Sequence, residues 1–347
     1  MPPPVIDGLR KDAKPGGYSD SGADIAFTLR SAGVRVVTPQ PDPDPTEAMD
    51  WVFPDTPQGI ATALAAGATM LWANTVLFAG HPLERVMDQC WIVGQLPAAM
   101  QTVDDKFATN ARLRAAGLPV AASLLAAPAA REGVHALASL TPQTLAGLGL
   151  EFPLIVKPVR GRGSQGVTLV DDHAAFMQAA VQLIDSNLFG ADLIVEQFLS
   201  GTEMTVTVMP EQTGQDGVTR APLPLPPVRR FNHEHGVAPY NGTVAVTSNS
   251  SALTANEQSD PQVGAMLEAC IRAARLVEAR APIRIDCRAD ADGVLQLFDL
   301  NMKPNMTGAG RPGRDDQDSL SAIAARAYGW DYSELLLRML DDAWKEA

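Results

Sequence analysis

The strongest constraint on the fold of this chain comes from residues 282–301, PIRIDCRADADGVLQLFDLN. They form two runs of alternating apolar and polar residues that meet at an Asp-Gly dipeptide. Alternation with a period of two is typical of strands with one buried face, and Asp-Gly suits a two-residue hairpin turn. A turn centred there places Asp286 opposite Asp299 and Arg284 opposite Asn301, all on one face of the hairpin.

Two opposed carboxylates repel each other, so this pair needs a compensating cation. Two carboxylates and an amide oxygen, with no His or Cys ligand, suit a hard cation such as Mg²⁺, or Mn²⁺, that also binds phosphate oxygens. In the alternative, one acidic side chain turns aside to solvent, or the register differs by one residue. Cys287, beside Asp286, is expected on the opposite, buried face.

A glycine-rich loop lies between two β-like runs, LIVKPV and VTLVDD. Its glycines, Gly161, Gly163 and Gly166, match the GxGxxG pattern of dinucleotide-binding proteins. That pattern requires a helix directly after the glycines, whereas this sequence predicts a strand. A strand–loop–strand unit is instead a flap that can cover phosphates with its backbone N–H groups. Lys157 would bring a positive charge to them; alternatively, this is an ordinary hairpin with Lys157 on a solvated face.

The chain has 347 residues, which leaves room for two or three domains. Its 27 Lys and Arg against 40 Asp and Glu give a net charge of −13, so nucleic acid and membrane surfaces are not expected partners. Three scattered cysteines do not make a disulfide framework, which favours a reducing, cytoplasmic location.

Residues 56–83 carry no Asp, Glu, Lys or Arg, which raises the question of a membrane span. The segment is rich in Ala, Gly and Thr rather than in Leu, Ile and Phe, and it contains Asn74. We therefore expect a helix over 59–66 and a buried strand region over 69–78. No targeting signal is expected in the N-terminal residues.

Local signals predict further elements around this segment. Residues 22–40 indicate a helix that ends at Gly33, followed by a short β-branched strand. Thr102 and Asp105 have the spacing of a capping box, which predicts a helix through Arg114.

Three helices are expected towards the C-terminus. Asp260 and Pro261 suit the N-cap and first position of a helix with one apolar stripe. The last two helices are predicted over 319–328 and 333–344. Proline in the segment 221–227 indicates a loop or an edge.

The glycine-rich flap, Lys157 and the carboxylate hairpin together suggest an ATP site. In this site, Arg284 would stabilise the transferred phosphoryl group. These residues resemble the ATP-grasp superfamily, and within it the D-alanine–D-alanine ligase-like carboxylate–amine ligases. The resemblance covers about residues 104–320. Its most specific motifs are FPLIVKPVRGRGSQGV, IVEQFLSGTEMTV and IRIDCRADADGVLQLFDLNMKPNMT.

The resemblance implies an ATP-grasp fold, with both α/β and α+β parts. Two α+β subdomains, over 104–192 and 193–347, would clasp ATP behind an α/β N-terminal domain over 1–103. It also implies the functional residues. The nucleotide contacts are Lys106, Lys157, Gly163 and Ser164 around phosphates or adenine, Glu196, Gln197, Phe198 and Leu199 as the adenine linker, and Glu203 on the ribose. The metal ligands are Asp286, Asp299 and Asn301, and the catalytic residues are Arg284, Ser164 and Lys157.

The substrate side departs from the family pattern. Asp20 and Asp24 stand where those ligases have a glutamate, and Lys303, Pro304 and Asn305 replace Ser-Pro-Gly. Arg311 and Arg314 can bind a substrate carboxylate or can pair with Asp315 and Asp316. Arg229 or Arg230 is expected to reach the phosphates. The expected substrate residues are Arg284, Lys303, Asn305, Arg311, Arg314 and His235.

The expected activity is ATP-dependent ligation of small carboxylate and amine substrates through an acyl phosphate, which releases ADP and phosphate. The N-terminal departures favour a specialised-metabolism or L-amino-acid ligase over a cell-wall enzyme. A small-molecule kinase and a non-catalytic ATP-binding protein are the alternatives, and Arg284 speaks against the second. Because the family is often dimeric through its N-terminal domain, a homodimer is one expectation.

Overall fold

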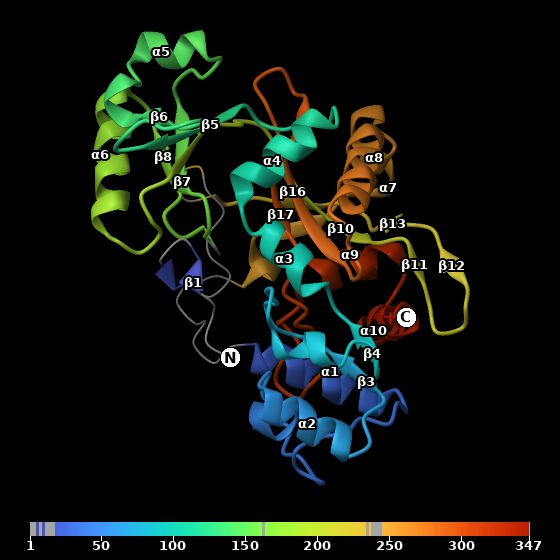
Figure 1. The fold of residues 1–347 in the computed structure, drawn as a ribbon. Helices are drawn as coiled ribbons and strands as arrows, with labels where there is room; N and C mark the ends of the chain where they lie inside the picture. The colour runs from blue at the N-terminus through green and yellow to red at the C-terminus, as the bar shows by residue number, and fades with distance from the viewer. Residues whose placement is uncertain are drawn as a thin grey trace.

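The computed structural model describes residues 5–6, 9–10, 18–161, 164–233, 236 and 245–346. Gly163 and His235, expected at the nucleotide and substrate sites, lie outside the described residues. Figure 1 shows the N-terminal part at one end of the molecule and the subdomain with the flap at the other. The remaining sheet and its helices lie between them.

Among the described residues, the N-terminal part contains helices α1 and α2 and a short parallel sheet (Figure 1). The sheet pairs β3 (Met70–Trp72) with β4 (Trp91–Val93). Helix α1 (Ser19–Ser31) is followed by Gly33 with φ +85°, and α2 (Pro57–Ala65) begins after the capping residue Thr56. A separate two-stranded unit joins β1 (Val5–Ile6) to β2 (Leu9–Arg10).

The strand predicted after Gly33 does not form. Residues 34–38 pair with no strand in the part of the chain that the structure describes. The Arg30 guanidinium instead donates to the Val36 carbonyl and to the hydroxyl of Thr38. The buried strand expected over 69–78 is confirmed only in part, since β3 ends at Trp72.

The subdomain with the flap is built on a five-stranded sheet in the order β6-β5-β9-β7-β8. The strands are β5 (Ser123–Ala127), β6 (His135–Ala136), β7 (Leu154–Pro158), β8 (Thr168–Val170) and β9 (Leu193–Gln197). Helices α5 (Pro142–Gly147) and α6 (His173–Asp185) belong to this subdomain (Figure 1). Strands β7 and β8 are antiparallel and the glycine loop joins them, which confirms the strand–loop–strand prediction.

A six-stranded sheet in the order β15-β14-β10-β16-β17, with β13 beside β10, forms the centre of the molecule. Its strands are β10 (Glu203–Met209), β13 (Leu223–Pro224), β14 (Val228–Arg230), β15 (Ser250–Ala252), β16 (Ile283–Ala289) and β17 (Leu295–Asn301). A small hairpin of β11 (Gln212–Thr213) and β12 (Thr219–Arg220) projects beside it (Figure 1).

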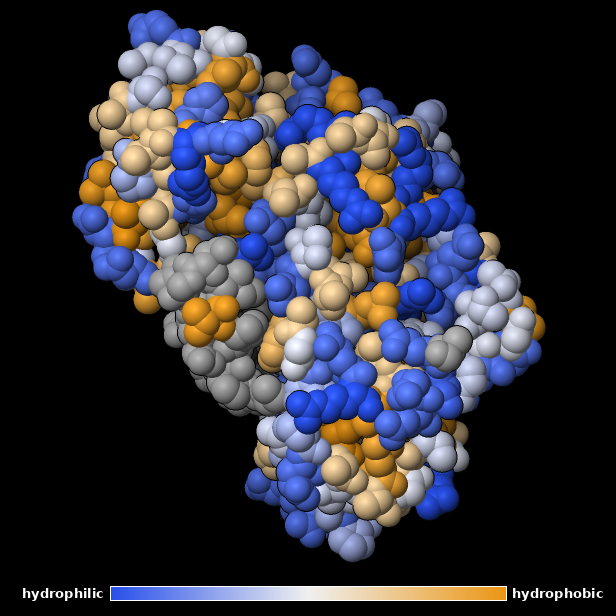
Figure 2. Space-filling model, viewed as in Figure 1, coloured by the Kyte–Doolittle hydropathy of each residue, from blue (hydrophilic) through white to orange (hydrophobic). Residues whose placement is uncertain are grey.

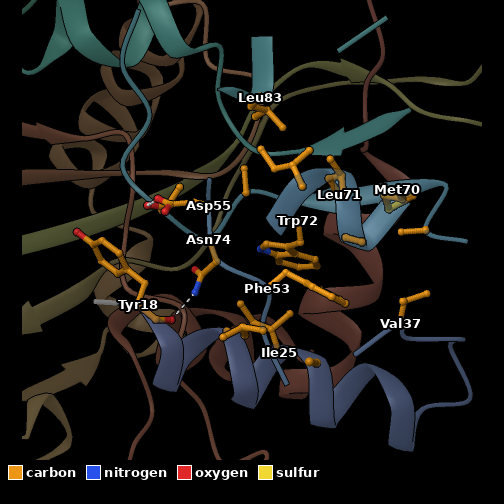
Figure 3. Close-up of a pocket in the computed structure, with 18 of the residues that line it drawn as sticks. Tyr18, Ile25, Val37, Phe53, Asp55, Met70, Leu71, Trp72, Asn74 and Leu83 are labelled. Atoms are coloured by element: carbon orange, nitrogen blue, oxygen red, sulfur yellow. Dashed lines mark hydrogen bonds between the residues drawn. The ribbon is translucent and has the colours of Figure 1, made fainter. Parts of the chain in front are cut away.

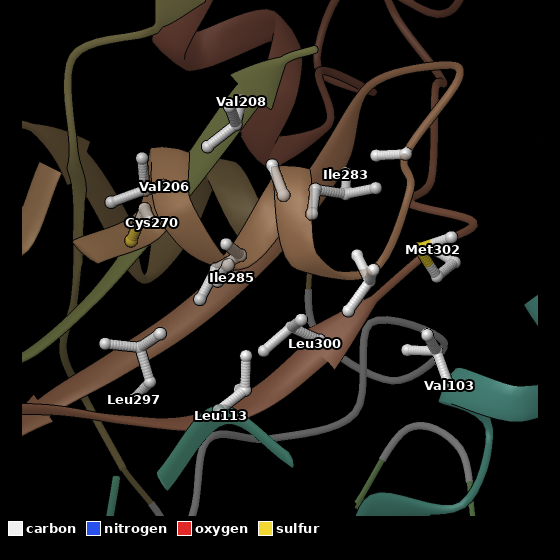
Figure 4. Packing of buried hydrophobic residues seen from close by; sticks show 14 of the residues in the cluster. Val103, Leu113, Val206, Val208, Cys270, Ile283, Ile285, Leu297, Leu300 and Met302 are labelled. Atoms are coloured by element: carbon white, nitrogen blue, oxygen red, sulfur yellow. The ribbon is translucent and has the colours of Figure 1, made fainter. Parts of the chain in front are cut away.

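The apolar face of this sheet packs against α8 (Pro261–Leu276), which begins after Asp260 as predicted. Figure 4 shows Val206, Ile285 and Leu297 gathered around Cys270 of this helix. Cys287 is fully buried, with its Sγ 3.7 Å from that of Cys270, which confirms its expected orientation. The core therefore fixes the opposite face of the same strands as the polar one.

Helices α3 (Pro97–Val103) and α4 (Lys106–Ala115) replace the single helix expected from Thr102. That prediction is wrong in its N-cap. Thr102 lies in the last turn of α3, where its hydroxyl donates to the Ala98 carbonyl. The Asp105 side chain accepts from the Ala108 N–H and caps α4. The capping residue one turn later places Lys106 at the first position of α4.

The chain ends with α7 (Ala255–Gln258) before α8, and with α9 (Leu320–Tyr328) and α10 (Tyr332–Asp341) after the carboxylate hairpin. Helix α10 ends before the predicted Trp344, because Trp344 pairs with Ile92 of β4 through hydrogen bonds of 2.7 and 2.9 Å. Four short 3₁₀ turns complete the described elements: Ala48–Asp50, Pro82–Arg85, Leu137–Ser139 and Val246–Ser248. Within the described ranges, none of the helices has the length and apolar character that crossing a membrane requires.

The carboxylate hairpin has the predicted pairing but a different turn. Asp286 lies opposite Asp299 and Arg284 opposite Asn301, as expected. The Asp290 carboxylate accepts from the N–H groups of Asp292 and Val294, which widens the turn to three residues.

A compensating irregularity restores the predicted pairing on the site side of the hairpin. Cys287 pairs with Leu297 while Asp286 pairs with Asp299, so Phe298 is an extra residue in β17. Such a bulge shifts the register by one position. The two departures from the predicted hairpin therefore cancel where the charged residues lie.

Candidate active site on the six-stranded sheet

One face of the six-stranded sheet is polar because its strands alternate between buried apolar residues and charged or hydroxyl side chains. Glu203 on β10 lies between Arg230 of β14 and Arg288 of β16, and Thr205 lies opposite Asp286. The side chains on this face are Arg230, Glu203, Thr205, Thr207, Arg284, Asp286, Arg288, Asp299 and Asn301. Four neighbouring strands thus concentrate positive and negative groups on one surface.

Asp286 is held in its ionised form by its own strand and by β10. The Arg284 Nε lies 3.1 Å from Asp286 Oδ1 and its Nη2 lies 3.3 Å from Oδ2. The Thr205 hydroxyl also donates to this carboxylate. Burial raises the pKa of Asp286, but Arg284 and Thr205 outweigh burial and hold that pKa below its usual range. The alternative in which Asp286 turns aside to solvent is therefore wrong.

Asp299, opposite Asp286, pairs with Lys106 at the start of α4. Two different elements thus supply one cation to each carboxylate, Arg284 to Asp286 and Lys106 to Asp299. The Asn301 Oδ1 accepts from the Lys303 N–H at 3.0 Å.

Two carboxylates and an amide oxygen on adjacent strands match the donor set that a hard divalent cation prefers. The described residues contain no group of three or more His, Cys, Asp or Glu side chains that could hold a metal ion by themselves. A cation at this face would therefore need further oxygen ligands, of the kind that phosphates or water provide.

Lys157 and Glu196 form a buried ion pair where β7 and β9 lie side by side. The Lys157 Nζ lies 2.6 Å from Glu196 Oε1 and 3.5 Å from the Phe298 carbonyl of β17. Lys157 is only 5% exposed, so the alternative that places it on a solvated face is wrong. Burial raises the pKa of Glu196 although Lys157 opposes this effect.

The residues after Glu196 lead from one sheet to the other. The Gln197 N–H donates to the Ala122 carbonyl at 2.9 Å, and its side chain bonds to the backbone of Glu151. The guanidinium of Arg288 lies 4.8 Å from the centre of the Phe198 ring. Leu199 is buried. This connection therefore lies beside the polar face of the six-stranded sheet.

Glu203, the expected ribose ligand, is buried and contacts two cationic or polar side chains. His233 Nε2 lies 2.8 Å from its Oε2, and Arg288 Nη1 lies 3.7 Å from the same atom. A ligand that binds Glu203 would compete with His233 for this oxygen. Sequence reasoning did not identify His233 or Arg288 as parts of this face, although Arg288 continues the alternation of Arg284 and Asp286.

The two arginines of β14 that were expected to reach the phosphates, Arg229 and Arg230, lie on opposite faces of the sheet. Arg229 points away from the polar face and its Nη2 lies 2.5 Å from Glu257 Oε1. Arg230 is 8% exposed, and its buried Nε and Nη2 have no hydrogen-bond partner among the residues that the structure describes. Burial lowers the pKa of Arg230, and the charges of Asp286 and Glu203 only partly oppose this effect. A buried cation with unused donors indicates an anionic ligand.

Comparison with known proteins identifies the family. The family model described as "D-ala D-ala ligase C-terminus" matches residues 113–341, well over half of the chain. The chain belongs to this family. Among relatives, the D-alanine–D-alanine ligase of Gloeobacter violaceus is 28% identical over 57% of this chain and 57% of its own length. The ligase of Stutzerimonas stutzeri is 29% identical over 63% of this chain.

The chain covers 57% and 61% of the lengths of these two relatives, less than two thirds of either. The fold is similar over a longer stretch. The D-alanine–D-alanine ligase from Bacillus anthracis has a TM-score of 0.63 at 17% identity, covering 92% of this chain and 89% of that one. Its structure in complex with ATP has a TM-score of 0.56 at 18% identity, covering 83% and 81%. The expected ATP-grasp fold is thereby confirmed.

On the substrate side, this member of the ligase family has an ion cluster that sequence reasoning did not anticipate. Arg311 Nε lies 2.7 Å from Asp24 Oδ1, and its Nη2 lies 3.2 Å from Asp20 Oδ1. Arg314 Nε also lies 2.8 Å from Asp24. Both arginines therefore bind α1 rather than the neighbouring Asp315 and Asp316. Arg311 is buried and its donors are engaged, which leaves it poorly placed to bind a substrate carboxylate directly.

The residues after Asn301 also connect to the N-terminal part. The Lys303 Nζ lies 4.4 Å from the centre of the Tyr18 ring and 3.2 Å from the Pro304 carbonyl. Asn305 Nδ2 lies 2.9 Å from the Thr307 hydroxyl. Ser164, at the edge of the described flap, has φ +63° and its carbonyl accepts from the Val167 N–H. Lys303 thus contacts Asn301, a candidate metal ligand, through its N–H and Tyr18, the residue before α1, through its side chain.

Proposed function

We propose that this chain is an ATP-dependent carboxylate–amine ligase. The carboxylate substrate takes the γ-phosphoryl group of ATP, which releases ADP and forms an acyl phosphate. The amine substrate then attacks the acyl carbon, loses a proton and displaces phosphate, which leaves an amide. The substrates we infer are small and amino-acid-like, as the names of the related ligases suggest.

The observation that carries this proposal is the juxtaposition of Arg230 and Arg284 with two opposed carboxylates. Arg230 presents buried donors that no described residue uses, and Arg284 extends from the neighbouring part of the same face. Guanidinium groups in a buried site stabilise the charge of a phosphoryl group during its transfer. A protein that merely bound a nucleotide would not need this concentration of charge at the phosphates.

Asp286, Asp299 and Asn301 would hold Mg²⁺, or Mn²⁺, together with phosphate oxygens. When bound, this cation neutralises charge that develops on the phosphates. Arg284 orients Asp286, and Lys106 does the same for Asp299, so both carboxylates are fixed before a ligand arrives. We infer that Lys106 shifts from Asp299 to the phosphates when ATP binds.

The nucleotide would lie between the two sheets, with the flap above it. Lys157, Gly163 and Ser164 would contact the phosphates, and the flap would exclude water from the acyl phosphate. The connection from Glu196 to Leu199 would bind adenine, and Glu203 the ribose. The Bacillus anthracis ligase, which shares this fold, was crystallised in complex with ATP, which supports ATP as the nucleotide.

On the substrate side, Arg284, Lys303, Asn305 and His235 would contact the substrates directly. Arg311 and Arg314 would instead position α1 through Asp24. We further propose three domains, over 1–103, 104–192 and 193–347, a homodimer and a cytoplasmic location. All three cysteines are free and buried, which supports a reducing location.

The test is ADP release with Mg²⁺ and ATP across single and paired D- and L-amino acids and small carboxylic acids. Hydroxylamine in parallel reactions would trap an acyl phosphate as a hydroxamate. The proposal predicts ADP release that depends on a pair of substrates and an amide product in equal amount. A stable phosphorylated compound instead of an amide would identify a kinase, and nucleotide binding without turnover on any pair would contradict the enzyme.

A further inference from the structure

Arg160 is the first charged residue after β7, where the chain enters the glycine-rich flap. Its Nη2 donates to Asp105 Oδ2 at 3.3 Å, and its Nη1 lies 3.7 Å from Asp104 Oδ2. The three side chains are between 20% and 27% exposed, so both ion pairs are partly shielded from water. Arg160 thus attaches the start of the flap, residues 158–161, to the two acidic residues directly before α4.

The attachment is fixed in orientation by the first turn of α4. Asp105 Oδ1 accepts from the Ala108 N–H at 2.9 Å and caps the helix, while its Oδ2 accepts from Arg160. Beside this contact, the Lys106 N–H donates to the Val159 carbonyl at 3.2 Å. The start of the flap is therefore bound to the first turn of α4 by a side chain and by the backbone.

This contact lies where three parts of the molecule meet. The flap joins β7 and β8 of the five-stranded sheet. Helix α4 packs on the six-stranded sheet, because its Leu113 lies in one apolar cluster with Leu297 and Leu300 of β17 (Figure 4). Asp104 also lines the pocket of the N-terminal part that is shown in Figure 3. Figure 2 shows hydrophilic residues on the surface between the subdomain with the flap and the centre of the molecule.

The other end of the flap is held in a different way. Gly166 has φ +72°, and a Cβ at this position would lie 2.9 Å from Leu183 of α6 and 3.3 Å from Phe189. The backbone at Gly166 therefore packs on apolar side chains of the flap's own subdomain. The start of the flap, in contrast, is bound by Arg160 to a helix that packs on the other sheet.

The helix to which the flap is bound also carries a residue of the candidate active site. Lys106 is the first residue of α4 and pairs with Asp299, a proposed metal ligand. Asp105, the partner of Arg160, directly precedes Lys106. A continuous set of contacts thus runs from the flap through Arg160 and the first turn of α4 to the proposed metal site.

We propose that Arg160 is a positioning residue that holds the start of the flap against α4, so that the flap covers the acyl phosphate. The inference rests on the proposed ligase function and deepens it. A flap whose start is fixed before ATP arrives loses less conformational freedom on binding. It also keeps water from the acyl phosphate until the amine attacks. Water that attacks first returns the carboxylate and phosphate, so that ADP is formed without an amide.

Variants can remove the contact from either side. Arg160→Met removes the cation, and the paired substitution Asp104→Asn with Asp105→Asn removes both negative charges. Asparagine is as good an N-cap as aspartate, so the paired variant keeps the cap of α4. Arg160→Lys retains a cation at the same position. Arg131→Met, which removes an exposed arginine from the same subdomain, is the matched control.

Two measurements separate positioning from a merely structural role. The first is calorimetric titration with Mg²⁺ and adenylyl imidodiphosphate, a non-hydrolysable ATP analogue, in the absence of substrates. The second is the ratio of ADP to amide, measured with the substrate pair that the ADP-release test identifies. Loss of folded protein lowers the amount of active enzyme, but it changes neither the dissociation constant nor this ratio.

Arg160→Met and the paired asparagine variant should each weaken binding of the analogue about fivefold, as expected for loss of a partly shielded ion pair that fixes the flap. Each should raise the ratio of ADP to amide from about one to about two or more. Because they break the same contacts, combining them should weaken binding no further than the larger single effect. Arg160→Lys should restore most of the binding and of the coupling, and Arg131→Met should change neither.

Unchanged affinity and an unchanged ratio in Arg160→Met would overturn the proposal. An effect of Arg160→Met without any effect of the paired asparagine variant would overturn it as well, because Arg160 would then act on the ligand and not through α4.

The two proposals fail in different ways. If the unmodified chain does not bind the analogue, or if no pair of substrates releases ADP, the ligase function is wrong and the role of Arg160 falls with it. If binding and coupled amide formation both survive the loss of Arg160, the ligase function stands and the positioning role alone is wrong.

Discussion

The six-stranded sheet and the N-terminal sheet differ in completeness. The first has continuous pairing from β15 to β17, one apolar face packed on α8 and one charged face. In the second, the described residues pair β3 with β4 and no further strand. The family match covers the first region and not the second. The family model therefore covers the sheet that carries the candidate active site and leaves the N-terminal sheet outside its match.

The largest effect should come from the carboxylates of the complete sheet. Asp299→Asn should lower pair-dependent ADP release on the order of 100-fold or more, because an amide oxygen cannot neutralise a divalent cation as a carboxylate does. Asp292→Asn, in the exposed turn of the same hairpin, is the control. Steady-state kinetics at varied Mg²⁺ would measure both. Near-normal turnover of Asp299→Asn would contradict the metal-site proposal.

Substitution of Arg230 should lower the activity and raise the stability of the protein. Arg230→Met should reduce kcat/KM for ATP at least about tenfold, because it removes a buried donor from the phosphates. The same change should raise the free energy of unfolding by about 1 kcal/mol or more, since Arg230 is a buried charge with unused donors.

Arg229→Met is the matched control for this comparison. Arg229 forms a half-exposed pair with Glu257, so its loss should cost at most about 1 kcal/mol and leave turnover unchanged. Urea unfolding and initial rates would be measured on both variants. If Arg230→Met destabilised the protein and kept its activity, Arg230 would be a structural residue.

The ion cluster that joins the two regions should contribute mainly to stability. Arg311→Met leaves Asp24 fully buried with Arg314 alone and should cost about 3 kcal/mol of unfolding free energy. The exposed pair of Arg131 and Asp192 provides the contrast, and Arg131→Met should change stability by less than about 1 kcal/mol. Equal effects in urea unfolding would show that Asp24 does not need Arg311.

The smallest effect concerns Asp342, after α10. Burial raises its pKa to about 6, although Arg338 and Arg220 oppose the shift. Because this pKa lies above the unfolded value, the wild-type chain loses stability as the pH rises from about 4 to about 6. Asp342→Asn should therefore gain stability relative to wild type across this window. Asp341→Asn, on the exposed neighbour, should not, and urea unfolding at pH 4.5 and 7.5 would compare them.

The sequence predicted the complete sheet better than the incomplete one, for physical reasons. A period of two assigns Arg284, Asp286 and Cys287 to faces whatever the turn is, and here a bulge at Phe298 cancels the longer turn. The turn itself depends on hydrogen bonds to the Asp290 side chain, which the Asp-Gly pattern does not reveal.

Long-range contacts explain most of what sequence reasoning missed. Asp24 and Arg311 are 287 positions apart in the sequence, so the local pattern around one does not identify the other as its partner. The β-branched run at 34–38 favours a strand, but a strand needs a neighbour, and the described part of the chain offers none.

The central claim is that a substrate carboxylate is activated by phosphoryl transfer from ATP. The most direct test uses an active substrate pair with ¹⁸O in the carboxylate of the acyl donor, followed by mass analysis of the released phosphate. Transfer through an acyl phosphate predicts one ¹⁸O atom in each phosphate formed. Phosphate without the label, formed together with ADP, would contradict the claim.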